Sequence, residues 1–442
     1  MGLGAELPLW TIAPFAGLLL SIALLPLATP HFWEHNRNRA LVAALFALPV
    51  VIYLPAVHGH EGVHVLLEKA HEYASFIVLL ASLYVITGGV HVRGSLSGTP
   101  LLNTALLAIG AALASWIGTT GASVLLIRPL LRANQPRQRK AHIVLFFIFA
   151  VSNCGGLLTP LGDPPLFLGF LKGVPFAWTF GLWREWLFVN GALLAIFHVW
   201  DQVVFAREER ERPGSQLEEV MVHEPLGIDG ARNLVWLFGV VAVIFGAGQG
   251  LGHGGAPWPF GVQELAMTAL AFLAYTTTRA ELRRLNSFAF SPINEVAILF
   301  AGIFATMAPA LLILNARAPG FGISEPWQFF WAAGALSSFL DNAPTYLTFA
   351  ATACGLEGID LEGRYLARFL EFGPRAAETL AAISCGAVFM GANTYIGNGP
   401  NFMVKAIAEE RGVRMPSFFG YMAYSGAILL PLFAVCTWLF FW

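Results

Sequence analysis

Charged residues are scarce in this chain. Asp, Glu, Lys and Arg make up 12% of its 442 residues, about half of the ~25% share that is usual in soluble domains. A soluble enzyme or a disordered protein of this length would carry more charge, so the composition excludes both classes. The net charge is −2, and without a basic excess we expect no nucleic-acid partner.

Cysteine is also rare. The four cysteines, mostly in apolar surroundings, are too few for a disulfide framework. No phosphate-binding glycine loop occurs in the sequence, which argues against an ATP-driven pump. No Lys or Arg precedes Arg37, so the first apolar run lacks the positive region of a cleaved signal and is interpreted as a retained membrane span.

Long apolar runs dominate what is present, because 57% of the residues are hydrophobic. Runs of roughly 20 such residues predict transmembrane helices, and therefore an all-α polytopic membrane protein. The expected spans are about 9–29, 40–57, 73–91, 142–172, 178–205, 233–251, 261–278, 291–314, 379–408 and 418–441.

Two further apolar stretches, 99–134 and 326–357, carry a polar break in the middle. The breaks are Gly118-Thr119-Thr120-Gly121 and Asp341-Asn342-Ala343-Pro344, and each predicts two short legs that meet at a tip. Such a re-entrant hairpin is tolerated in a membrane where protein or a cavity surrounds its backbone. The expected architecture is therefore about ten spans plus two hairpins.

The placement of basic residues predicts the orientation. With the N-terminus outside and both stretches treated as hairpins, most of the 25 basic residues fall in cytoplasmic segments. The polar segment 206–232 is then a cytoplasmic linker, and segment 355–378 lies outside. Both termini are expected outside, in a multi-pass protein of the inner membrane.

The most polar motifs occur twice in the same order. Ser115–Ser123 aligns with Ser338–Tyr346, and Thr159–Phe167 aligns with Thr394–Phe402. The predicted domains are a first repeat over 1–205, the 206–232 linker and a second repeat over 233–442. An odd number of spans in each repeat would invert the second relative to the first, as in many secondary transporters.

These motifs carry a family resemblance. The segments Ser152–Pro165, Leu340–Pro344 and Gly391–Pro400 resemble the ion transporter superfamily, in the branch of NhaD-type sodium/proton antiporters, arsenite permeases and citrate transporters. The resemblance implies two inverted repeats, each with a hairpin and a broken helix (142–172 and 379–408). It also implies a homodimer in which a transport domain moves against a fixed scaffold.

Two acids are the main candidates for ion binding. Asp163 lies in a Gly-Asp-Pro-Pro break between apolar segments, where a carboxylate is usually functional and could bind Na⁺ or a proton. The alternative is a helix cap, since Asp favours that position. Asp341, together with Asn342, is the same kind of candidate at the second tip, although Asp-Asn-x-Pro is also ordinary turn chemistry.

Neutral oxygen donors flank both breaks and both tips. They suit a desolvated cation or a substrate carboxylate, or else hydrogen bonds between helices. The first tip lacks the acid and the asparagine of the second, which leaves open whether it binds a cation. The candidates are Thr119, Thr120, Asn153, Thr159, Gly162, Asn342, Thr345, Asn393, Thr394, Asn398 and Asn401.

A remote alternative is a membrane metalloprotease. His60-Glu61-Gly62-Val63-His64 matches the H-E-x-x-H zinc motif. Gly59 and Gly62 disfavour a helix there, and we expect the motif in an outer loop.

The sequence thus predicts a secondary transporter and not an enzyme. A sodium/proton antiporter is expected, in which Asp163 and Asp341 bind Na⁺ and H⁺ in mutually exclusive fashion. The alternatives are an ion-coupled citrate or carboxylate carrier and an arsenite permease. No cofactor is expected beyond the coupling ion, and the partners are a small ion or carboxylate and membrane lipid.

Overall fold

The computed structural model describes residues 3–94, 97–211, 227–254, 256 and 258–442. These residues are mostly helical, with one short two-stranded sheet, which confirms an all-α polytopic membrane protein. Within the described chain, eight helical segments are long and apolar enough to cross a membrane. They are Leu9–Pro26, Asn36–Thr87, Pro100–Ile117, Ala141–Leu158, Phe176–Glu211, Arg232–Gln249, Ser291–Gly320 and Phe418–Phe440.

The difference from ten expected spans has local causes. Helix α4 runs through both expected spans 40–57 and 73–91 and bends at Gly59, whose φ of 55° lies in the left-handed region that glycine tolerates. Helix α11 has 16 residues and α17 has 17, fewer than the ~20 that a full crossing requires. In the opposite direction, Pro100–Ile117, expected as one leg of the first hairpin, is itself long and apolar enough to cross.

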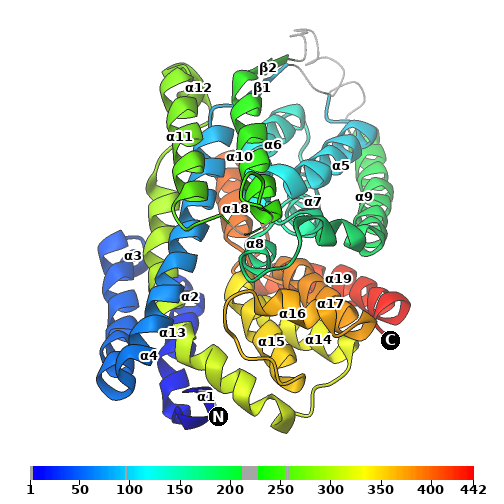
Figure 1. The fold of residues 1–442 in the computed structure, drawn as a ribbon. Coiled ribbons are helices and arrows are strands. Elements are labelled where there is room, and N and C mark those ends of the chain that lie inside the picture. Colours follow the sequence, from blue (N-terminus) through cyan, green and yellow to red (C-terminus); the bar gives the residue numbers. More distant parts are fainter. Residues whose placement is uncertain (1–2, 95–96, 212–226, 255, 257) are drawn as a thin grey trace.

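The helices form two groups that lie side by side (Figure 1). The first helix group is built around α4 and α13, which pack extensively against each other. Its members are α1 (Leu3–Glu6), α2 (Ala13–Ala28), α3 (Pro30–Trp33), α4 (Asn36–Thr87), α10 (Arg232–Gln249), α11 (Val262–Thr277), α12 (Ala280–Leu285) and α13 (Ser291–Arg317).

The second helix group contains shorter helices with frequent interruptions. From the first half of the chain come α5 (Pro100–Ile117), α6 (Thr119–Ala133), α7 (Ala141–Ala150), α8 (Pro164–Leu171) and α9 (Trp183–Glu211). From the second half come α14 (Pro326–Ser337), α15 (Asn342–Leu356), α16 (Tyr365–Glu371), α17 (Pro374–Met390), α18 (Gly399–Glu410) and α19 (Phe418–Phe440).

The interruptions in this group fall at the polar motifs. α5 and α6 are separated only by Gly118, and α14 and α15 by residues 338–341. α7 stops at Ala150 and α8 begins at Pro164, with a 3-10 turn between them; α17 and α18 are separated in the same way. Proline and glycine at these positions end a helix locally, because they remove a backbone donor or add flexibility.

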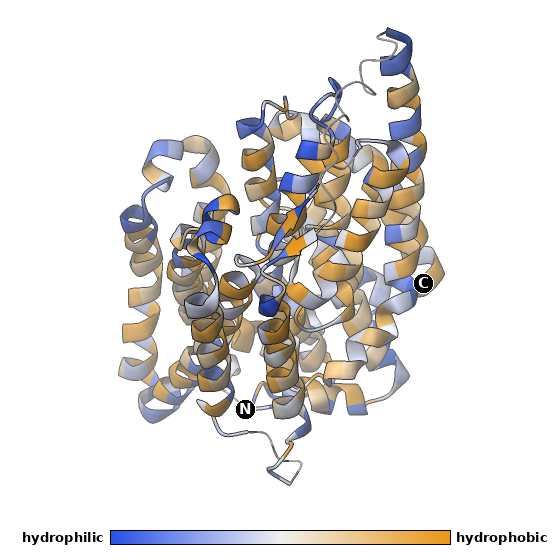
Figure 2. Ribbon diagram, turned by 90° about the horizontal axis from the view of Figure 1, so that it is seen from above, coloured by the Kyte–Doolittle hydropathy of each residue, from blue (hydrophilic) through white to orange (hydrophobic). Residues whose placement is uncertain are grey.

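Burial distinguishes interior helices from outer helices. Helix α7 is apolar on all sides and buried from His142 to Ala150, as a helix inside a bundle should be. By contrast, Phe238, Leu265 and Phe272 of α10 and α11 are each more than 60% exposed. Figure 2 shows hydrophobic residues along the outer helices, where a membrane protein contacts lipid.

Several segments that connect helices are tied together at one end of the molecule. Strands β1 (His91–Arg93) and β2 (Gly227–Asp229) pair antiparallel there. Arg132 donates to the carbonyl of Val92 at 2.7 Å, and His91 bonds Asn286 at 2.8 Å. Of the expected linker 206–232, residues 206–211 continue α9, and residues 212–226 lie outside the described part of the chain.

Candidate substrate and ion site

Four helices begin at one place in the second helix group. α6 begins at Thr119 and α15 at Asn342, each directly after a hairpin tip. α8 and α18 follow the extended residues Asp163 and Asn398, which occupy the N-cap positions. The first N–H groups of a helix lack partners and carry positive partial charge, so these helix starts favour an anion.

Asp163 joins the four segments. Its carboxylate accepts hydrogen bonds from Thr119 Oγ1 at 3.0 Å, from Asn342 Nδ2, and from Asn398 Nδ2 at 3.4 Å. The residue is 1% exposed, and no ion pair with it occurs among the described residues. A buried carboxylate held only by neutral donors is costly in a membrane unless an ion or a proton compensates it.

The two acids play different local roles. Asp163 occupies the N-cap of α8, yet its side chain makes no capping hydrogen bond and turns to the tips instead. Asp341 is the N-cap of α15, and its Oδ1 accepts from the Ala343 N–H at 3.1 Å. The local capping or turn role weighed for each acid is thus seen for Asp341, whose neighbour Asn342 bonds Asp163.

A layer of buried asparagines connects the two helix breaks. Asn153 Nδ2 donates to Asn401 Oδ1 at 2.7 Å, and Asn398 Nδ2 lies 3.2 Å from Asn153 Oδ1. Asn401 also donates to the carbonyls of Gly391 and Thr394. These side chains come from α7–α8 and α17–α18, so the network holds the two breaks against each other.

Corresponding threonines anchor each break to its own hairpin. Thr159 Oγ1 donates to the carbonyl of Ser115, and Thr394 Oγ1 donates to the carbonyl of Ser338. Each threonine oxygen also accepts a hydrogen bond from the backbone N–H two residues later. The aligned threonines thus make the same hydrogen bonds in both halves of the chain.

Glycines let the backbone of each break fold closely on itself. A Cβ atom at Gly162 would overlap the carbonyl oxygen of Gly156. At Gly397 it would lie 2.6 Å from the carbonyl oxygen of Gly391. Gly162 is therefore required because any side chain would overlap the backbone. Its carbonyl oxygen accepts a hydrogen bond from the Thr119 N–H at 2.9 Å.

Two buried amide oxygens near the tips have no donor within the described structure: Oδ1 of Asn342 and Oδ1 of Asn393. The amide nitrogens of the same side chains are bonded, to Asp163 and to the Ser338 hydroxyl. An unsatisfied buried acceptor costs about 1–3 kcal/mol. A bound cation or a substrate hydroxyl would satisfy such oxygens.

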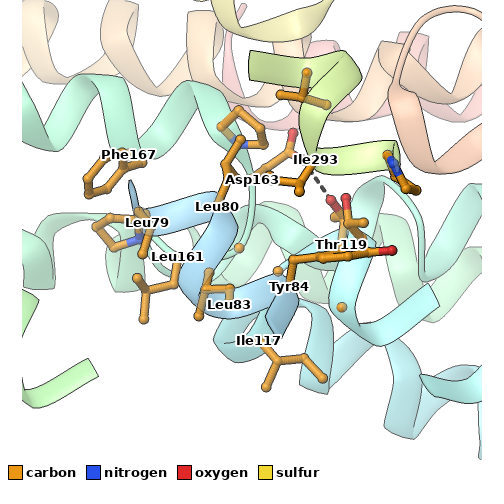
Figure 3. A pocket seen from close by; sticks show the side chains of 18 residues that line it. Leu79, Leu80, Leu83, Tyr84, Ile117, Thr119, Leu161, Asp163, Phe167 and Ile293 are labelled. Carbon is orange, nitrogen blue, oxygen red and sulfur yellow. Dashed lines mark hydrogen bonds between the residues drawn. The ribbon is translucent and has the colours of Figure 1, made fainter. Parts of the chain in front are cut away.

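A cavity of about 90 Å³ lies between Asp163 and the first helix group (Figure 3). Leu79, Leu83 and Tyr84 of α4 form one wall, and Thr119 and Asp163 lie on the other. The site thus lies at the boundary between the two helix groups.

A family model described as "Putative citrate transport" matches residues 4–441. The chain belongs to this family. No curated protein shows significant similarity to it. Membership in the citrate transport family makes the protein a multi-pass membrane transporter and agrees with a function that is not enzymatic. The family description names neither sodium/proton exchange nor arsenite.

Three further predicted site residues of this citrate transport family member make no hydrogen bond to Asp163 in the described structure. Thr120 lines the cavity. Thr345 Oγ1 bonds the carbonyl of Asp341 at 2.9 Å, inside its own helix start. Asn393 bonds Ser338 at 2.9 Å.

Two serines and the α4 wall belong to the site although no sequence motif indicated them. Ser115 Oγ donates to the carbonyl of Gly155 at 2.5 Å, and Ser338 Oγ accepts from Asn393. Both serines occupy aligned positions of the repeat, which was a usable signal. The α4 wall is apolar, and nothing in its sequence distinguishes it from lipid-facing residues.

The metalloprotease alternative finds no support in the described residues. His60, Glu61 and His64 are helical and follow directly on the kink at Gly59, where two helices of α4 meet, so the part of the prediction that disfavoured a helix there is wrong. All three side chains are exposed. Within the described chain, no cluster of three His, Cys, Asp or Glu residues could hold a metal ion.

Proposed function

We propose that this protein is a secondary active carrier of small carboxylates such as citrate, coupled to Na⁺ or H⁺. The observation that carries the proposal is the convergence of four helix starts on one buried carboxylate, Asp163. The family's description supplies the substrate class.

The helix starts can bind the anion. Half-helix N-termini recognise substrate carboxylates in other transporters with broken helices, because their N–H groups and dipoles point at the ligand. The helix starts therefore supply the positive potential. Lys405, the lysine within α18, does not, because it pairs with Glu409 at 2.9 Å.

Asp163 makes the coupling obligatory. A substrate carboxylate beside a charged Asp163 would be repelled, since two like charges 4 Å apart interact by about 4 kcal/mol at an effective dielectric constant of 20. Na⁺ or a proton on Asp163 removes this repulsion. For Na⁺, the unpaired Asn342 Oδ1 supplies a second oxygen ligand.

A sodium/proton antiporter is the second candidate, and the size of the cavity favours it. About 90 Å³ is smaller than the ~150 Å³ apolar cavity that holds a benzene molecule. This conformation has room for an ion with water, and a tricarboxylate would require it to widen. In such an antiporter Na⁺ and H⁺ exchange at Asp163, with Asp341 beside it capping the start of α15.

Alternating access follows from the boundary beside the site. In this proposal the second helix group moves against the first, and the cavity faces each side of the inner membrane in turn. We further propose that the two halves are inverted repeats, that both termini lie outside, and that the protein works as a homodimer.

Transport in proteoliposomes tests the proposal. We expect radiolabelled citrate uptake that requires an inward Na⁺ or H⁺ gradient. Liposomes containing the Asp163→Asn variant, or no protein, serve as controls. A Na⁺-dependent change of luminal pH without citrate uptake would instead support the antiporter.

A further inference from the structure

A second cavity, of about 820 Å³, lies where α7 begins. The ten residues of α7, about 15 Å of helix, separate this end from the break that leads to Asp163. Its walls come from the segment before α7, from α9, from the segment after α18 and from α19. The volume falls within the ~300–1,000 Å³ range of small-molecule sites.

Two arginines of this basic cavity are already neutralised. Arg137 pairs with Asp201 at 2.6 Å and with Glu208 at 3.1 Å. Arg139 pairs with Glu211 at 2.9 Å. These ion pairs connect the segment before α7 to the end of α9. They also neutralise the charges of Arg137 and Arg139, so these arginines add little positive potential to the cavity.

Two other cations on the cavity wall have no acidic partner in the described part of the chain: Lys140 and Arg414. Lys140 Nζ bonds only the carbonyl of Gln135, at 3.2 Å. Burial lowers the pKa of Lys140, and Glu208 nearby opposes this shift. A partly desolvated lysine and an unpaired arginine on one wall favour a bound anion.

The remaining wall is aromatic and apolar. The Trp200 and Tyr424 rings lie 6.0 Å apart, and such rings mark the level of lipid headgroups. On the outer side of α9, Val199 is 65% exposed and Val203 is 46% exposed. The cavity therefore opens beside a helix surface that hydrocarbon chains can cover.

We propose that this cavity binds the phosphate of an acidic phospholipid, whose acyl chains lie along the outer face of α9. Lys140 and Arg414 contact the phosphate. Basic pockets between transmembrane helices on the cytoplasmic side are suited to such headgroups. The bound lipid would link the segment before α7 to the segment after α18, which come from different halves of the chain.

Native mass spectrometry and lipid titration test this site without requiring transport. The full-length protein is placed in nanodiscs of phosphatidylcholine, with or without phosphatidylglycerol. We expect wild type to bind phosphatidylglycerol saturably. The double variant Lys140→Gln/Arg414→Gln should bind it roughly 30-fold more weakly, about fivefold for each cation removed.

The matched control is Arg279→Gln/Arg284→Gln, which removes the same charge from exposed residues on and beside α12. It should bind like wild type, and equal loss in both double variants would overturn the site in favour of general surface attraction. Melting temperatures in pure phosphatidylcholine monitor folding, and the single variant Arg414→Gln, at an exposed position, repeats the test. Full competition by millimolar inorganic phosphate would overturn the lipid assignment in favour of a soluble anion.

Discussion

Asp163 is an acid whose three side-chain partners are all neutral and all come from other segments. Thr119, Asn342 and Asn398 can each donate to the carboxylate, but none cancels its charge. Burial of such a group is stable only with a bound cation or proton. Its side chain makes no capping hydrogen bond, so the geometry favours the proposed ion-binding role over a helix cap.

The first prediction concerns this charge. Asp163→Asn should reduce gradient-driven citrate uptake, or Na⁺-driven proton movement, to the level of protein-free liposomes. The amide can keep most hydrogen bonds, so the melting temperature should change little. Asp163→Glu keeps the charge but shifts it, and should retain partial activity.

Asp360→Asn is the matched control, because Asp360 is an exposed acid away from the tips and breaks. It should transport like wild type. Normal coupled transport by Asp163→Asn would disprove the ion-binding role of Asp163.

The second prediction separates Asp341 from Asp163. The Asp341 side chain caps α15 through the Ala343 N–H, and Asn caps about as well as Asp. Asp341→Asn should therefore keep transport and stability, whereas Asp341→Ala should lose about 1 kcal/mol of stability. Thermal unfolding and proteoliposome uptake measure the two effects; loss of transport in the stable Asn variant would show that Asp341 takes part in ion binding.

At the scale of elements, local signals located the helix ends well. The Gly-Asp-Pro-Pro motif at 162–165 coincides with the start of α8, and Asp341-Asn342 coincides with the start of α15. These signals act within a few residues, since proline and glycine limit the backbone directly. A helix at His60–His64 was not predicted, because Gly59 and Gly62 have weak helix propensity. In the structure, α4 nevertheless resumes directly after Gly59.

The third prediction tests the close backbone packing in the breaks. Gly162→Ala and Gly397→Ala each push a methyl group against a backbone carbonyl, and should destabilise the protein by about 1–3 kcal/mol. Gly191→Ala, in α9 with open space around it, is the control and should keep or slightly raise the melting temperature. Equal melting temperatures for all three variants would contradict the packing argument.

At the scale of the whole molecule, the partners of Asp163 could not be predicted. Asn342 and Asn398 are 179 and 235 residues away from it in sequence, and their meeting depends on how the two hairpins and breaks pack. The buried Arg137–Asp201 pair was missed for the same reason. A motif search finds polar residues in apolar runs but cannot tell which of them share a site.

Basic segments that are distant in sequence are nevertheless joined at one end. The cavity at the start of α7 is lined from both the segment before α7 and the segment after α18, and Arg139 also reaches Glu211 at the end of α9. A second set of contacts involves Lys172, which follows α8. Its side chain pairs with Glu68 at 2.9 Å, and its carbonyl oxygen accepts a hydrogen bond from the Leu366 N–H. Segments expected on the same side of the membrane are thus in contact.

The last prediction is the topology itself. Gln135→Cys, before α7, and Glu362→Cys, before α16, place thiols at exposed positions in segments expected on opposite faces. A membrane-impermeant maleimide should label Glu362→Cys from outside in spheroplasts and Gln135→Cys only in inverted vesicles, because basic segments stay cytoplasmic. The parent protein should remain unlabelled, since its four cysteines are buried, and detergent should make both variants reactive. Labelling of both positions from one face would rule out inverted repeats and, with them, alternating access through two opposed halves.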